Sequence, residues 1–375
     1  MLQGINLTLM IGPAIPIIAP KVVVEALTSV QVTNSKDNSG FQLVFTIGKD
    51  SPILTSMLPA GYFDPILTRV IIVVTLNGMP HVLMDGLVTN QQFAPSNEPG
   101  KSILTIIGED LSIAMDLIEI IAPFTAMPDV AKLYLRLAPY LAFGVIPLVI
   151  PPSISPIKPP TSGWTSQAKV TDKALFKDLA QKVGYIFVVE PGPLVGQSIA
   201  YFGPNVNLPI PQKALTINLD SQSNIEALSF SLNGTAKQVR VFTIFDPVTG
   251  KIPIPIPLPN INFLKPPLGA RPLLPSKIEF EKEGSQLQMA DALQKILGFM
   301  MNTPPSVTAN GSLDVMRYKG ILRARMLVGV RGAGITYDGL YYVDTVTHNI
   351  KKGEYKQSFT LSRDGLVSNT PFLPV

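Results

Sequence analysis

The strongest constraint on this fold is a period-two alternation of apolar and polar residues that recurs along much of the chain. One run places apolar residues at every second position, namely Phe41, Leu43, Phe45 and Ile47. Such alternation is typical of a strand with one buried face. Turn residues separate the runs, as at Asn77-Gly78, which suits the positive φ angles of a type I′ hairpin turn. The sequence therefore predicts a mainly antiparallel β protein.

The first barrel is predicted at 1–110, where alternating runs recur at Val70–Leu76, His81–Val88 and Ser102–Ile107. From Leu111 the apolar spacing becomes helical, so 111–206 is predicted as an α+β insertion domain. Its expected elements are a helix over Leu111–Ile118, a helix from Asp129, a helix from Asp172 as N-cap to Gly184 as C-cap, and strands at Tyr185–Glu190 and Gln197–Phe202.

A second antiparallel β-barrel is predicted at 207–245 and 306–368, split by an insertion. The inserted residues 246–305 hold a Pro-rich arm, Lys251–Pro275, and an amphipathic helix, Ser285–Met301. Proline lacks the N–H that a β-ladder needs, so the arm is expected to be extended and unpaired. It and a second Pro-rich stretch, Ile146–Pro160, are expected to lie across neighbouring subunits, with exposed linkers as the alternative.

An internal repeat supports the two barrels. Asp85-Gly86-Leu87 precedes a Gly100-Lys101 turn, a strand and Asp110, and Asp338-Gly339-Leu340 precedes a Gly353-Glu354 turn, a strand and Asp364. The first glycine of each copy is expected to make a tight turn before a strand. Two tandem homologous barrels are therefore predicted, as an alternative to chance similarity.

Composition narrows the functions that remain. The chain has 375 residues, of which 46% are hydrophobic and only 15% are charged. Much of its surface is therefore uncharged and expected to be covered by partners. A net charge of +4, without basic runs, argues against nucleic acid. The first twenty residues lack the features of a signal peptide. Prolines interrupt the apolar stretch Leu133–Ile150, which favours a buried helix and an extended arm over a membrane span.

Candidate chemistry is sparse. There is no Cys, and His81 and His348 lack carboxylates at metal-ligand spacing, so both are expected at the surface or an interface. Glu109 and Asp110 are expected to stabilise a helix N-terminus rather than to form a carboxylate pair for hydrolysis. Gly332-Ala333-Gly334 is expected to be a turn and not a dinucleotide loop. We expect no catalytic residue, no cofactor site and no metal site.

The C-terminal stretch Asp338–His348, with Gly353-Glu354-Tyr355 and Phe359–Arg363, resembles the closing motif of phage late control protein D and related tail hub proteins. Ile107–Ser112 and Leu175–Tyr185 are similar to the same family, in the same order along nearly the whole chain. Members are central hubs of contractile phage tails, type VI secretion systems and extracellular contractile injection particles.

The resemblance implies a structural protein without enzymatic activity. It implies a homotrimer in which each chain gives two tube-like barrels, so that a pseudo-sixfold ring joins a hexameric inner tube to a trimeric spike. The spike is expected to be a separate protein, because the chain stops at Val375, and other baseplate proteins are expected partners. Assembly is expected in the bacterial cytoplasm, in a phage-tail-like particle that is released or membrane-anchored.

The main alternative from another class is a secreted β-sandwich that binds a ligand or acts as an adhesin. Such a protein would be monomeric and would carry an aromatic platform, which a single Trp164 and dispersed Tyr residues do not favour. An enzyme and a membrane-inserting protein are further alternatives. The sequence does not identify the contractile system, its target or its cargo.

Overall fold

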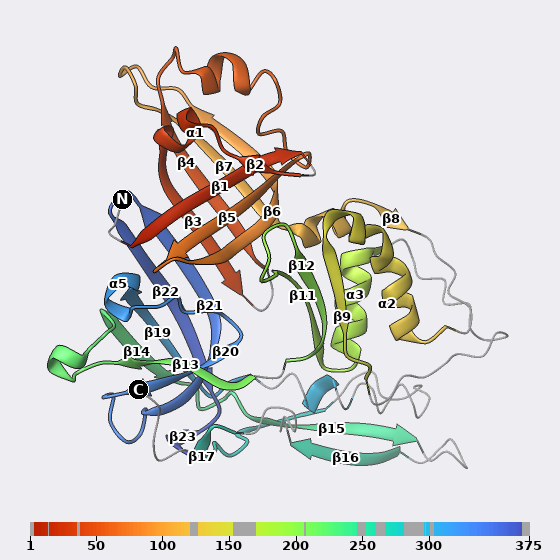
Figure 1. Ribbon diagram of the computed structural model, residues 1–375. Helices are drawn as coiled ribbons and strands as arrows, with labels where there is room; N and C mark the ends of the chain where they lie inside the picture. Colours follow the sequence, from red (N-terminus) through yellow and green to blue (C-terminus); the bar gives the residue numbers. More distant parts are fainter. Residues whose placement is uncertain are drawn as a thin grey trace.

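A 13-stranded sheet that brings together both ends of the chain dominates the computed structural model (Figure 1). The structure describes residues 4–13, 15–35, 38–120, 127–152, 170–205, 208–245, 253–259, 267–280, 296, 298–300 and 304–369. The expected mainly antiparallel β fold is confirmed, because most ladders of this sheet are antiparallel.

The first strand set occupies the N-terminal part of the sheet. Its strands lie in the order β3-β4-β7-β6-β5-β1, with the short β2 beyond β1. Helix α1 (Lys21–Ala26) precedes β3, and the π-helical turn η1 (Ile53–Met57) precedes β5. The strands are β1 (Ile5–Pro13), β2 (Ile17–Ile18), β3 (Leu27–Ser35), β4 (Gly40–Ile47), β5 (Thr68–Leu76), β6 (Met79–Ala94) and β7 (Ser102–Asp110).

The second strand set repeats this order with C-terminal strands. β14-β19-β22-β21 are neighbours, followed by β20 and β13, and only the last ladder differs, being parallel where β1 and β5 are antiparallel. Short helices η4 (Asp220–Gln222) and α5 (Val315–Tyr318) connect these strands. The strands are β13 (Leu208–Thr216), β14 (Ala227–Leu232), β19 (Val307–Asp314), β20 (Met326–Arg331), β21 (Gly339–Lys351) and β22 (Glu354–Arg363).

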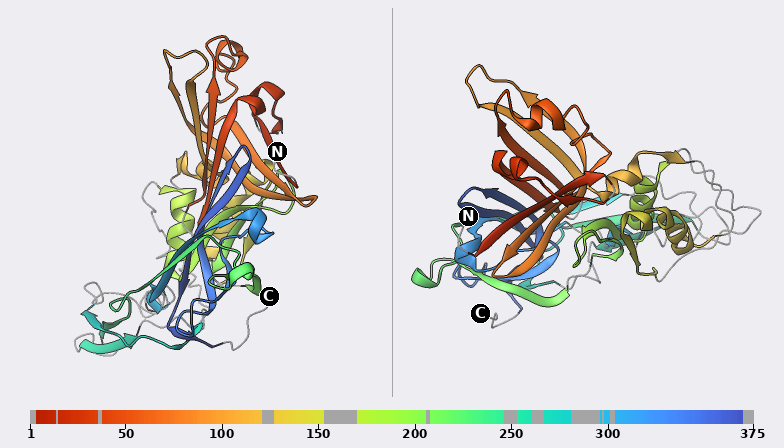
Figure 2. Two further views of the ribbon diagram at one scale, coloured as in Figure 1. Left: turned by 90° about the vertical axis from the view of Figure 1, so that its left-hand side faces the viewer. Right: turned by 45° about the horizontal axis from the view of Figure 1, so that its top comes forward.

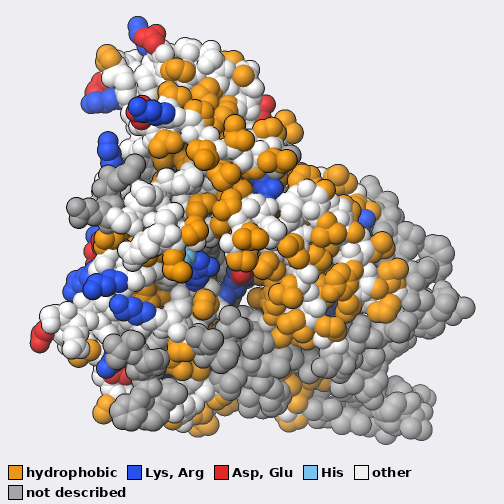
Figure 3. All heavy atoms as spheres, in the orientation of Figure 1, with side chains coloured by type: hydrophobic (Ala, Val, Ile, Leu, Met, Phe, Trp, Pro, Cys, Tyr) orange, Lys and Arg blue, Asp and Glu red, His pale blue; other side chains and the backbone are white. Residues whose placement is uncertain are grey.

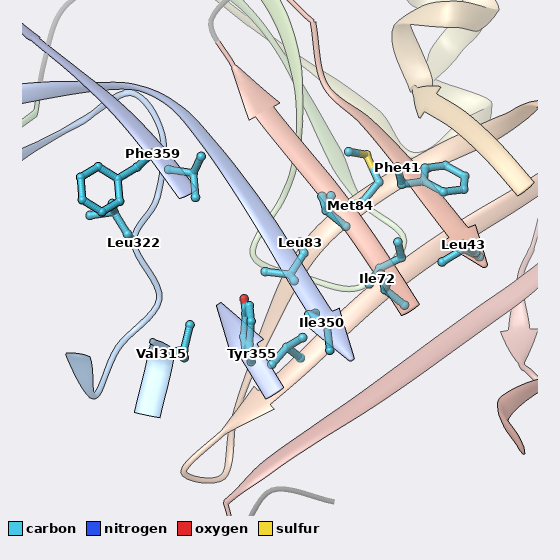
Figure 4. Close-up of a cluster of buried hydrophobic side chains, with 14 of the residues drawn as sticks. Phe41, Leu43, Ile72, Leu83, Met84, Val315, Leu322, Ile350, Tyr355 and Phe359 are labelled. Carbon is cyan, nitrogen blue, oxygen red and sulfur yellow. The ribbon is translucent and has the colours of Figure 1, made fainter. Parts of the chain in front are cut away.

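A ladder between β3 and β21 joins the two strand sets into one sheet. It runs antiparallel from Ser29 opposite Lys351 to Ser35 opposite Thr345. One apolar core therefore extends beneath both sets. Figure 4 shows part of it, in which Phe41 and Leu43 of β4 belong to the same cluster as Ile350 and Tyr355 of the second set. Because this core is shared, the two sets stabilise one another.

The insertion between the sets has a separate core and stands beside the large sheet (Figure 2). The predicted helix from Asp129 and the helix before Gly184 are present, and Thr171 rather than Asp172 is the N-cap. The helix expected over Leu111–Ile118 is a short 3₁₀ helix that ends before Ile118. The elements are η2 (Leu111–Asp116), β8 (Glu119–Ile120), α2 (Asp129–Leu137), η3 (Ala138–Phe143), β9 (Val145–Val149), β10 (Val170–Thr171), α3 (Asp172–Lys182), β11 (Tyr185–Pro191) and β12 (Ser198–Pro204).

The arm differs from the prediction in two respects. β15 (Gln238–Phe245), expected in the second barrel, forms a separate sheet with β16 (Pro253–Pro259) and β18 (Lys277–Phe280). The Pro-rich β16 is paired after all, because prolines at every second position direct their missing N–H groups to the same edge and leave the other edge complete. β17 (Gly269–Arg271) pairs with β23 (Leu366–Ser368). The helix predicted at Ser285–Met301 lies almost wholly outside the described residues.

Turn glycines behave as predicted at three hairpins and differently at a fourth position. Asn77 has a φ of 51° and Gly78 a φ of 82°, as a type I′ turn requires. Gly100 and Gly353 also have positive φ. Gly86, expected in a turn, lies inside β6. There a Cβ would overlap the Glu109 carbonyl oxygen, so the glycine permits close backbone approach.

Arg363, the last residue of β22, is a buried cation bound by backbone carbonyls. Its buried guanidinium donates to the carbonyl oxygens of Gly365 at 3.0 Å, Asp338 at 2.8 Å and Thr336 at 2.8 Å, and lies 4.4 Å from the centre of the Tyr341 ring. It thereby holds the turn before β21 against the end of β22. A hydrogen bond to a charged donor contributes about 1.5–3 kcal/mol.

We expect Arg363→Lys to lower the free energy of unfolding by about 2–4 kcal/mol, because an ammonium cannot reach three carbonyls in one plane. Urea unfolding followed by circular dichroism measures it. The matched control is Arg271→Lys at an exposed position. Equal, small effects of the two substitutions would contradict the role given to Arg363.

Candidate functional site: a central groove and open apolar faces

A groove of about 610 Å³ lies where both strand sets meet the insertion. Its lining comes from the β3–β4 hairpin, from β6, from β9, β11 and β12 of the insertion, and from the loop before β20. Figure 3 shows it near the middle of the face, with basic, acidic and histidine side chains between hydrophobic surfaces. The groove is thus a junction of three parts of the chain.

The cations of the groove already have partners. Arg325 forms an ion pair with Glu190 of the insertion, and burial lowers the pKa of Arg325 to about 10. Arg323 lies 3.0 Å from Nδ1 of His81, and burial, followed by the charge of Arg323, lowers the pKa of His81. Asn34 Oδ1 and Arg325 Nε are buried without a hydrogen bond. These contacts join the loop before β20 to the insertion and to β6.

His348 was predicted at the surface or an interface, but it lies buried within the chain. It is 1% exposed on β21, and its Nδ1 lies 2.8 Å from the Tyr355 hydroxyl and 3.2 Å from Gln357 Nε2. Gln357 in turn bonds the backbone of Leu322, at 3.0 Å and 2.8 Å. The alternation around His348 placed it on the face opposite to Val343, but a register shift between Val343 and Thr345 turns it inward.

His348 should make stability depend on pH. Burial lowers its pKa from 6.5 to about 3, so between these values only the unfolded chain binds the proton. The free energy of unfolding should therefore fall by about 1.4 kcal/mol per unit as pH drops from about 6.5 towards 3. His348→Gln should lose this component and His81→Gln should keep most of it, in urea unfolding across that range. An unchanged slope in His348→Gln would contradict the assignment.

A buried ion pair fastens the insertion to the first strand set. Arg69 of β5 donates from Nε and Nη2 to the two carboxylate oxygens of Asp85, each at 2.7 Å. Arg69 Nη2 also reaches the Gly196 carbonyl at 3.0 Å, and the Ser198 hydroxyl donates to Asp85 Oδ2 at 3.2 Å. Since Gly196 and Ser198 belong to the insertion, the repeat residue Asp85 positions one domain on another.

We expect Asp85→Asn to lower the free energy of unfolding by about 3–5 kcal/mol, because it leaves the buried Arg69 charge without its counter-ion. Denaturant unfolding measures the loss. Glu25→Gln, which breaks the exposed Lys21–Glu25 pair, is the control and should cost less than about 1 kcal/mol. A loss of similar size in both variants would show that the clamp is dispensable.

The predicted role of Asp110 as a helix-terminal acid is confirmed. Its carboxylate accepts the backbone N–H of Ser112 at 2.8 Å, as the N-cap of η2, and that of Ser39 at 3.2 Å. Burial raises its pKa above the ordinary value, against the opposing effect of these hydrogen bonds. Glu109 instead pairs with Lys173 of α3 at 3.6 Å. The two acids thus do not face one another as a hydrolytic pair.

Metal and membrane sites are not found in the part of the chain that the structure describes. There, no three His, Asp or Glu side chains gather closely enough to hold a cation. No helix within the described ranges has the length and hydropathy needed to cross a bilayer. Leu133–Ile150 instead forms α2, η3 and β9.

Apolar side chains remain open to solvent over three parts of the surface. The insertion exposes one such face, seen on the right of Figure 3, and the sheet ends expose Ile17, Ile18 and Leu232. The end of the arm and the following strand β18 expose Leu274, Ile278 and Phe280, by 68–84%. Contiguous apolar faces are usually covered by other proteins. Those of the insertion are Tyr134, Leu135, Leu141, Phe143, Ile146, Leu148 and Ile150, which are 38–55% exposed.

Comparison of the whole fold identifies its class. A tail protein from Neisseria meningitidis MC58 superposes with a TM-score of 0.61 and 13% identity, covering 97% of this chain and 98% of that chain. The 43 kDa tail protein of prophage MuSo2 from Shewanella oneidensis gives 0.60 and 13%, covering 96% and 98%. The fold is therefore that of phage tail proteins.

A third structure with a similar fold is a component of a secretion system. The E. coli c3393 protein, a component of the type VI secretion system with structural similarity to the T4 tail proteins gp27 and gp5, gives a TM-score of 0.52 at 10% identity, covering 93% of this chain and 76% of that chain. No protein-family model and no curated protein matches the sequence. The resemblance to the tail hub family is thus confirmed at the level of the fold.

Proposed function

We propose that the chain is the central hub of a contractile injection system or phage-tail baseplate. In this role three copies form a ring that seats the inner tube on one side and a trimeric spike on the other. The fold it shares with tail proteins supports this role, as do the exposed apolar faces and the 15% share of charged residues.

The observation that carries the proposal is the identical strand order of the two sets. Because each set arranges six strands in the same sequence of neighbours, one chain presents two similar surfaces side by side. Three chains then present six, which matches a sixfold tube, while the ring keeps the threefold symmetry that a spike requires. We propose that the sets, 1–110 and 208–232 with 306–368, are homologous tube-like barrels.

The groove and the buried networks favour a scaffold over an enzyme. Arg69 with Asp85, which is buried, and Arg325 with Glu190, which lines the groove, both join the insertion to a strand set. We propose that the chain has no catalytic activity, assembles in the bacterial cytoplasm and joins tube, spike and other baseplate proteins in a tail-like particle.

Native mass spectrometry of the purified chain should give a species three times the 40.5 kDa of the monomer. Mixed with the tube and spike proteins of the same system, the trimer should co-elute with both in size-exclusion chromatography. An unrelated hexameric tube protein is the control and should not co-elute. A chain that stays monomeric and joins neither partner would refute the hub.

A further inference from the structure

We propose that Asn90–Ala94 of β6 in one copy of this chain pairs, as an antiparallel strand, with β14 of the next copy. The inference rests on the proposed trimer and specifies the contact that closes it. It follows from a ladder that the chain already makes with itself.

Several strand edges are open in the described part of the sheet, including that of β13, and two of them correspond to the partners in the β3–β21 ladder. β14 lies at one end of the sheet and pairs only with β19. β6 pairs with β5 as far as Leu87, and beyond that point Asn90–Ala94 has β7 on one edge and no ladder on the other. All five residues of this segment are exposed. Open strand edges bind further strands readily.

β21, the counterpart of β6, shows what occupies such an edge. The first part of β21, to Tyr342, pairs with β20, as β6 pairs with β5. A register shift follows in each strand, at Asp344 in β21 and at Thr89 in β6. Beyond its shift, β21 receives β3 along the edge that remains open in β6. The open edge of β6 is thus the equivalent of a filled one.

β14 is the counterpart of the strand that fills it. β3 lies beside β4 as β14 lies beside β19, and both pairs continue into β7 and β22. In the first set, Val32 of β3 lies opposite Phe41 of β4, which in turn lies opposite Gly108 of β7. In the second set, Phe230 of β14 lies opposite Ala309 of β19, which in turn lies opposite Leu361 of β22. Val32 and Phe230 are therefore equivalent positions.

These equivalences fix the register between copies. Val32 pairs with His348 inside the chain, so Phe230 should pair with Phe93 of the next copy. Thr33 pairs with Thr347, where the hydroxyls lie 3.2 Å apart, so Ser231 should pair with Gln92. The predicted partners thus place two aromatic rings on the core face and two polar side chains on the other face.

The side chains suit this pairing. Phe93 is 39% exposed and Phe230 is partly buried, and stacking them would cover both rings. Neither Asn90–Ala94 nor Ala227–Leu232 contains a charged residue, although exposed edges are usually protected by charge. The two edges lie far apart, with the β6–β7 hairpin near the top of Figure 1 and β14 at lower left. A contact between them is head-to-tail and can close a ring.

Disulfide trapping tests the register, since the chain has no Cys of its own. Directly opposed residues have Cβ atoms about 4.5–5.5 Å apart, within reach of a bond after small shifts. Gln92→Cys/Ser231→Cys should therefore give covalent dimers and trimers, and nothing larger, on a non-reducing gel after mild oxidation. Thr33→Cys/Thr347→Cys is the matched control and should close within one chain, without a change in mass.

Two further variants test the register of the β6–β14 ladder and the formation of the trimer separately. Gln92→Cys/Leu232→Cys places its thiols on opposite faces and should not cross-link. Phe93→Lys should convert the trimer to monomer in native mass spectrometry, whereas Ile335→Lys, at a residue 83% exposed elsewhere, should leave it intact.

The outcomes test the β6–β14 contact and the proposed hub function separately. A native trimer in which Gln92→Cys/Ser231→Cys fails to cross-link, while the Thr33→Cys/Thr347→Cys control closes, would overturn the β6–β14 pairing and leave the hub standing. A monomer that binds neither tube nor spike would overturn the hub and the pairing together. Covalent trimers at the predicted pair would support both.

Discussion

The ladder between β3 and β21 is the interaction on which the rest of the structure depends. It joins the N-terminal and C-terminal strand sets into one sheet over one core. Without it each set would end in an open edge and an exposed apolar face, which is costly in water. The ladder also fixes the distance between the sets, and therefore the width of the groove in which Asn34 of β3 and His348 of β21 take part.

Ion pairs and their hydrogen bonds attach the insertion to the two strand sets, whereas a β-ladder joins the sets to each other. Arg69 and Asp85 bond its turn at Gly196 and its strand at Ser198, while Arg325 of the second set reaches Glu190. Buried ion pairs of this kind add little net stability over apolar contacts, but they tolerate only one geometry. The three parts of the chain therefore meet in a defined arrangement, with the apolar face of the insertion left outward.

Much of the fold could be read from the sequence, because local patterns determine local structure. Alternation at Phe41–Ile47 and the positive-φ residues at Asn77-Gly78 determine strands and a turn within a few residues. The strands of the second set were largely predicted, but β15 was placed there wrongly. Its alternation does not encode which sheet it joins, since that depends on partners far along the chain.

The residues of the groove were harder to predict for the same reason. His348 was predicted at the surface or an interface and not in the core. A register shift reverses the facing of every residue after it and leaves no mark in the periodicity. Arg363 and Asp85 were part of a recognised repeat, yet their partners are backbone carbonyls and a distant domain. A lone cation or acid within an apolar strand is the signal that points to such buried networks.

The ladder also has a consequence for synthesis. Gln31 of β3 donates to Asn349 of β21 across 318 positions of sequence, so β3 waits for its partner until nearly the whole chain has left the ribosome. During that time the β3 edge can pair with other strands, and the N-terminal set is exposed to misassembly. A chain cut short before β21 cannot complete the sheet. Folding of the complete sheet therefore has to follow completion of the polypeptide.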